Sequence, residues 1–205
     1  MPPMSALRGD PDGTREAIMQ ATYLALCTHG YADLTIERIG EEFDKSPSSI
    51  YHHYDGKDEL LVDFLRYMLE HFEADVALED YEDAHAHLRA LLDHVVPATL
   101  DEERAEFTRA MTELRARAAT DERYRRRITK HNRFFHDRIA AIVRTGIDQG
   151  VFRDIDPEQV AELLLTTING AMNQQVTAEA DAPVRAVRAE LDEYVRSRLL
   201  IEGRE

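Results

Sequence analysis

Apolar residues recur along most of this 205-residue chain at intervals of three and four positions, the spacing of one face of an α-helix. In the first quarter the pattern is broken into short pieces. Ile18 to Leu26 indicates one helix, Ile36 to Phe43 a second, and Pro47 to about Tyr54 a short third. The residues at the ends of these pieces suit helix termini, with Thr14, Thr35 and Ser46 as N-caps and Gly30 just after the first helix.

From Lys57 onward the helical pattern runs in longer segments that end near prolines, glycines or capping residues. Asp156, followed by Pro157, is expected to cap one of them. No segment alternates as a strand would, so the pattern predicts an all-α fold of about nine helices. The six longer helices are expected at 57–72, 88–97, 101–119, 121–149, 157–179 and 184–200.

The charge balance is strongly acidic, with 40 Asp and Glu against 25 Lys and Arg and a net charge of −15. Only three of the basic residues are lysines, namely Lys45, Lys57 and Lys130. A lysine-poor, acidic protein is typical of organisms that accumulate salt, in which screening reduces self-repulsion. We therefore interpret the chain as one from a halophile, and an ordinary acidic protein is the alternative.

The remaining composition favours an intracellular protein. Cys27 is the single cysteine, so the chain cannot form an internal disulfide, which fits a reducing compartment. No run approaches the roughly 18 to 20 apolar residues of a membrane span. The first residues carry prolines and charges but no apolar core of an export signal. We expect a cytoplasmic protein without a membrane partner.

Residues 35–54 have the pattern of a helix, a tight turn and a second helix, which is the size of a DNA-reading helix-turn-helix. Ile36, Ile39 and Phe43 give the first helix an apolar inner face. Ile50 and Tyr54 are expected to point into the same small core. The second helix would then present short polar and hydrogen-bonding side chains to the major groove.

This region resembles the N-terminal domain of the TetR/AcrR family of transcriptional regulators. The similarity covers about 50 residues at fixed spacing, and it is carried by Thr14-Arg15, Gly30-Tyr31, Leu34-Thr35-Ile36, Ile39, Ser46, Ile50 to Tyr54, Lys57 and Leu60-Leu61. The resemblance implies a helix-turn-helix DNA-binding domain at residues 1–56. It also implies a ligand-sensing and dimerisation bundle at residues 57–205.

The resemblance also implies roles for single residues. Thr35, Tyr51 and Lys57 match phosphate contacts of the family. Ser46, Ser48 and Ser49 match positions that touch bases or backbone, and His52 and His53 match positions that face the groove. Two positions depart from the family pattern: Asp44 stands where a turn glycine is usual, and Lys45 replaces a small apolar residue but could point toward phosphate. The implied DNA-binding residues are Thr35, Lys45, Ser46, Ser48, Ser49, Tyr51, His52, His53 and Lys57.

The acidity of the chain is the main objection to DNA binding. The first 56 residues hold four basic and nine acidic side chains, for a local net charge of −5. In molar salt, however, counterion release contributes little to affinity and long-range repulsion is screened. Binding would then depend on hydrogen bonds, base contacts and shape. We therefore expect specific DNA binding to survive molar KCl.

The family resemblance further implies a small-molecule effector inside the C-terminal bundle and a homodimer through the last two helices. Two recognition helices one DNA turn apart would read a palindromic operator, most commonly as a repressor. Plain core positions are the alternative for each expected pocket residue. The expected pocket residues are Phe72, Phe107, Met111, Phe134, Phe135, Ile168, Asn169 and Met172, with His131 as a further polar candidate.

Two other classes of protein are the alternatives to a DNA-binding regulator. A di-iron enzyme needs paired Glu-x-x-His motifs, and the chain holds Glu82 with His85 but no clear second pair. Phosphate-binding loops, zinc-protease motifs and nucleophile elbows are also missing from the sequence. We expect no enzymatic activity, no metal and no cofactor. The remaining alternative is a helical protein-interaction or ligand-binding module without DNA binding.

Overall fold

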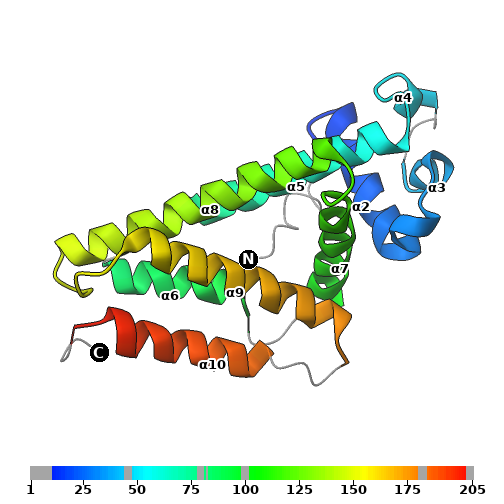
Figure 1. The fold of residues 1–205 in the computed structure, drawn as a ribbon. Coiled ribbons are helices and arrows are strands. Elements are labelled where there is room, and N and C mark those ends of the chain that lie inside the picture. Colours follow the sequence, from blue (N-terminus) through cyan, green and yellow to red (C-terminus); the bar gives the residue numbers. More distant parts are fainter. Residues whose placement is uncertain are drawn as a thin grey trace. The chain divides into compact units, whose positions relative to one another are not determined.

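The computed structural model describes residues 11–43, 48–77, 81, 83–97, 102–179 and 184–201. These residues form helices and no extended strand, with one isolated antiparallel bridge between Phe152 and Leu200. The all-α prediction is confirmed. The helices are α2 (Thr14–Asp33), α3 (Ile36–Glu41), α4 (Ser48–Tyr51), α5 (Lys57–Ala77), α6 (Ala84–Val95), α7 (Glu102–Arg117), α8 (Glu122–Asp148), α9 (Pro157–Thr177), α10 (Val184–Tyr194) and the π-helical turn η1 (Val195–Leu199) (Figure 1).

Several predicted helix ends are wrong: α5 continues to Ala77 beyond the expected residue 72, and α6 starts at Ala84 before the expected residue 88. Gly13 and not Thr14 occupies the N-cap position of α2. Gly30 does not end this helix but kinks it, and the helix continues to Asp33. The φ of Gly30 is 70°, a left-handed value that glycine adopts without a side-chain clash. The described part of the short third helix ends at Tyr51, before the predicted Tyr54, and its expected start at Ser46 lies outside the described residues.

The chain divides into two compact units. The first contains Met1–Asp75 together with Arg109–Ile128, and the second contains Val76–Thr108 together with Thr129–Glu205. These units have other bounds than the two predicted domains, because the first unit includes most of α5 and parts of α7 and α8. The predicted boundary after residue 56 is a functional division and stays a prediction.

The first unit is built around α2, α3 and α5, and α3 packs against α2. Leu114 and Tyr124 add fully buried side chains from α7 and α8. Buried residues of this core include Ile18, Met19, Ile39, Ile50, Leu60, Leu61, Phe64 and Leu65.

The second unit contains α6, α9, α10 and most of α8, and α9 lies beside α10 (Figure 1). The buried Arg188 of α10 pairs with Asp93 of α6 and with Asp192 one turn away. Backbone bonds tie the chain end to the loop after α8, since Ile201 N–H donates to the Val151 carbonyl at 3.1 Å. These contacts hold α10 against the rest of the unit.

Candidate nucleic-acid interface

The first helix of the helix-turn-helix is fixed by its cap and its buried face. The Thr35 hydroxyl accepts a hydrogen bond from the Arg38 backbone N–H at 3.2 Å, so the predicted N-cap is confirmed. Ile36 and Ile39 are buried, as the spacing predicts. Thr35 itself is exposed, which leaves it accessible to a partner.

The second helix presents one exposed tyrosine between two buried anchors. Ile50 is fully buried and Tyr54 is 7% exposed, whereas 53% of Tyr51 is exposed. This arrangement follows from helical spacing, because residues 50 and 54 share a face that Tyr51 does not. The predicted burial of Ile50 and Tyr54 is confirmed. Of the other predicted contacts, Ser48, His52 and His53 are exposed and Ser49 is half-buried, while Lys45 and Ser46 lie outside the described residues.

The exposed Tyr51 hydroxyl is oriented by an acidic side chain of the first helix. It donates a hydrogen bond to Glu37 Oε1 at 3.1 Å. This bond raises the pKa of Tyr51 above its ordinary value, so the hydroxyl keeps its proton at neutral pH. A protonated hydroxyl can donate to a phosphate oxygen. Since it has only one proton, Tyr51 would exchange Glu37 for the phosphate on binding.

The loop after the second helix is anchored through Asp63 on α5. Tyr54 donates to Asp63 at 2.7 Å, and Arg15 of α2 makes two bonds to the same carboxylate at 2.9 and 3.1 Å. Arg66 donates to it as well, at 2.9 Å. Burial alone would raise the pKa of Asp63, but the bonds from Arg15, Tyr54 and Arg66 outweigh it and lower the pKa to about 2. Asp63 therefore ties the reading elements to α2 and α5.

Lys57, a predicted phosphate contact, is held at the start of α5 by Tyr31. Its ammonium donates to the Tyr31 carbonyl at 2.9 Å and lies 4.6 Å from the centre of the Tyr31 ring. Arg117 of α7 lies 5.3 Å from the same ring, and Glu113 accepts the Tyr31 backbone N–H at 2.9 Å. Burial lowers the pKa of Lys57. The ammonium has two further N–H donors, which are enough for a phosphate contact. That contact stays a prediction.

The predicted effector residues are distributed over both units. Met111 is buried in the first, and Phe72 is half-buried there. In the second unit Phe135, Ile168 and His131 are buried, Asn169 and Met172 are half-buried, and Phe134 lines a cavity of about 340 Å³. The Phe107 side chain lies outside the described residues. Membership of one ligand pocket stays a prediction.

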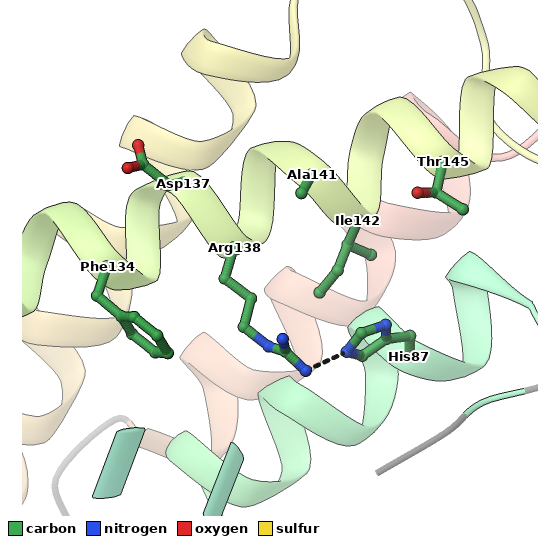
Figure 2. A pocket seen from close by; sticks show the side chains of 7 residues that line it. All are labelled: His87, Phe134, Asp137, Arg138, Ala141, Ile142 and Thr145. Atoms are coloured by element: carbon green, nitrogen blue, oxygen red, sulfur yellow. Dashed lines mark hydrogen bonds between the residues drawn. The ribbon is translucent and has the colours of Figure 1, made fainter. Parts of the chain in front are cut away.

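Figure 2 shows the cavity that Phe134 lines, between α6 and α8 of the second unit. Sequence reasoning missed the polar pair there, because Arg138 donates to His87, which lies 51 positions earlier in the chain. The helical interval from Phe134 to Arg138 could have placed the arginine on the same face. Nothing local in the sequence identifies His87 as its partner. The cavity is lined by His87, Phe134, Asp137, Arg138, Ala141, Ile142 and Thr145.

In the described part of the chain, no group of three or more His, Cys, Asp and Glu side chains is arranged to hold a metal ion. Among the same residues, no helix combines the length and apolar character needed to cross a membrane.

Comparison with known proteins identifies the family. Residues 18–64 match the model of bacterial regulatory proteins of the tetR family, and residues 64–200 match that of the C-terminal part of BetI-type transcriptional repressors. The transcriptional repressor AcnR of Corynebacterium glutamicum is 23% identical over 197 residues, which cover 95% of this chain and 100% of the relative.

Solved structures of transcriptional regulators are also similar to this chain. A TetR transcription regulator from Haloarcula marismortui is 37% identical, with a TM-score of 0.83, covering 90% of this chain and 97% of the other. A putative transcriptional regulator from Saccharomonospora viridis, solved in complex with choline, has a TM-score of 0.80 at 24% identity and covers 92% and 98% of the two chains. AcnR is a transcriptional repressor, and the two solved structures are those of transcriptional regulators. The chain belongs to the TetR family of DNA-binding transcriptional regulators.

Proposed function

We propose that the protein is a repressor that binds a palindromic operator as a homodimer and releases it when a small-molecule effector binds. The AcnR relatives are repressors, which favours repression for this chain. The protein would then act in the cytoplasm, where bacterial and archaeal operators lie. The alternative from the sequence, a module without DNA binding, is disfavoured by the family.

The exposed Tyr51 is the observation that carries the proposal. Its neighbours Ile50 and Tyr54 are buried, so the backbone that presents the hydroxyl is fixed before DNA arrives. A fixed donor loses little conformational entropy on binding. Thr35, Ser48, His52 and His53 add exposed hydrogen-bonding groups from the same two helices and the turn after them, and they support a DNA-facing surface.

The exposed side of α9 supports the proposed dimer. Leu163 is 48% exposed, and Thr166, Gly170 and Asn173 follow it at helical spacing on the exposed side. A methyl group placed on Gly170 would have no heavy atom within 4 Å. A stripe of one large apolar residue and small neighbours allows a second helix to approach closely, as a two-fold interface requires. We assign this face of α9, with α10, to the dimer contact.

Effector control follows from differential binding to two states of the dimer. In one state the two recognition helices have the spacing of the operator, and in the other they do not. An effector that binds the second state more tightly lowers operator affinity, and its difference in affinity for the two states sets the size of the effect. Choline, with which the Saccharomonospora viridis relative was solved, serves as the cationic comparison compound in the search for the effector.

The test compares operator affinities of matched tyrosine variants. Tyr51→Phe removes a single hydroxyl. A bond to a charged group contributes about 1.5–3 kcal/mol, but the free protein gives up the Tyr51–Glu37 bond to make it, so affinity should fall by about three- to tenfold. Tyr81→Phe, which keeps the ring that stacks on His87, removes a hydroxyl from the second unit and, with no effector present, should leave operator affinity unchanged. Fluorescence anisotropy on a selected duplex gives both values. Equal affinities for Tyr51→Phe and the natural protein would remove Tyr51 from the interface.

A further inference from the structure

The cavity between α6 and α8 has a polar end and an apolar wall. The guanidinium of Arg138 and the imidazole of His87 face each other at the polar end, while Phe134 and Ile142 extend from α8 on the same side (Figure 2). Among the described residues that line the cavity, Asp137 is the one carboxylate, and its side chain is 70% exposed and points away from Arg138 and His87 (Figure 2). The described lining at the polar end is therefore cationic.

His87 fixes the plane of the Arg138 guanidinium. The distance from Arg138 Nη2 to His87 Nε2 is 3.2 Å, and because arginine can only donate, Nε2 must be the acceptor. The imidazole is then neutral, with its proton on Nδ1. Tyr81 stacks on the imidazole, with ring centres 4.7 Å apart and planes tilted by 22°. His87 is thus a positioning residue for Arg138.

The two helices that form the cavity are joined at a second point. The backbone N–H at the start of α6, that of Ala84, donates to Gln149 Oε1 just after α8 at 3.0 Å. Asp83 caps the same helix end by accepting the Ala86 N–H at 2.8 Å. The Ala84–Gln149 and Arg138–His87 bonds hold α6 against α8. The cavity is therefore formed before a ligand arrives, which lowers the cost of binding.

We propose that this cavity binds a small organic carboxylate, whose carboxylate group lies on Arg138 and whose apolar body lies along Phe134 and Ile142. A planar guanidinium with a fixed orientation matches the two oxygens of a carboxylate. The volume of about 340 Å³ is at the small end of ligand cavities. Such a carboxylate would be the effector, and only its effect on operator affinity rests on the proposed function.

The test measures binding of 4-fluorobenzoate to the full-length protein by fluorine NMR titration, without DNA. The natural protein should bind 4-fluorobenzoate saturably. Affinity should fall by about tenfold or more in Arg138→Gln and by less in Arg138→Lys, which keeps the positive charge but not the paired N–H donors of the guanidinium. Arg133→Gln is the matched control, because it removes the same charge from an exposed position on α8. Circular dichroism confirms that each variant is folded.

Two comparisons decide the outcome. The cationic 4-fluorobenzylammonium and the neutral 4-fluorobenzyl alcohol should bind at least tenfold more weakly than 4-fluorobenzoate. Equal losses in Arg138→Gln and Arg133→Gln, or tighter binding of the cation, would overturn the carboxylate site. Since this titration contains no operator, its failure leaves the DNA-binding proposal intact. Carboxylate binding that leaves operator affinity unchanged would instead count against effector control.

Discussion

Replacing Asp63 by Asn tests the anchor beneath the recognition helix. The Asp63 carboxylate accepts bonds from Arg15, Tyr54 and Arg66, which come from α2, from the loop after α4 and from α5 itself. Asn removes the negative charge while keeping the shape of the side chain. The two arginines then lose their common counter-charge at a site where the Asp63 side chain is only 16% exposed.

The size of the effect follows from the lowered pKa. A shift from 3.8 to about 2 corresponds to about 2 kcal/mol of stabilisation by the ionised carboxylate at neutral pH. Arg15 and Arg66 are 44% and 37% exposed, so solvent screening reduces the net value to about 1–2 kcal/mol. Because the pKa of the folded protein is the lower one, this stability is complete above about pH 4. It is lost as the pH falls toward 2.

Urea unfolding followed by circular dichroism measures this difference, at one protein concentration because a dimer would add a concentration dependence. Glu70→Gln is the control, since it removes the same charge from an exposed position of α5. Asp63→Asn should be about 1–2 kcal/mol less stable than the control between pH 7 and pH 5, and the gap should narrow below about pH 4. Equal stability of the two variants at pH 7 would refute a stabilising role for the Asp63 network.

Three further substitutions have defined outcomes. Gly146→Ala would place a methyl group 2.1 Å from a ring carbon of the buried Phe152, so the free energy of unfolding should fall by about 1–3 kcal/mol. Thermal unfolding measures this loss, and an unchanged Tm would contradict the packing of Phe152 on Gly146. Asp156→Ala removes the side chain that accepts two N–H groups at the start of α9 and should cost about 1 kcal/mol in urea unfolding; no loss would mean that the cap is dispensable. Glu37→Gln removes the negative charge beside the Tyr51 hydroxyl, which would repel a phosphate. Fluorescence anisotropy should therefore show tighter DNA binding at low salt and a smaller gain in molar KCl, where the repulsion is screened. Weaker binding by the variant would contradict this reasoning.

The sequence predicted features that depend on neighbouring residues. Thr35 and Asp156 are N-caps as expected, and Ile50 and Tyr54 are buried, because helical spacing determines which residues share a face. The kink at Gly30 was missed, since a glycine near a helix end is equally compatible with a stop.

Contacts between distant segments could not be predicted in the same way. Arg188 and Asp93 are 95 positions apart, and Arg138 and His87 are 51 apart. Such pairs depend on which helix packs against which, and one sequence holds no local pattern for that choice. The expected pocket residues illustrate the limit, because helical spacing identifies an inward face but does not distinguish a core position from a cavity wall.

The central claim is that this acidic chain reads a specific DNA sequence as a dimer. Selection of binding sites from random duplexes with the purified protein, in about 1 M KCl where the Debye length is about 3 Å, tests it most directly. The account predicts recovery of a palindrome whose half-sites lie about one helical turn apart, and loss of that enrichment in Tyr51→Ala. Recovery of no sequence preference at either high or low salt would contradict it.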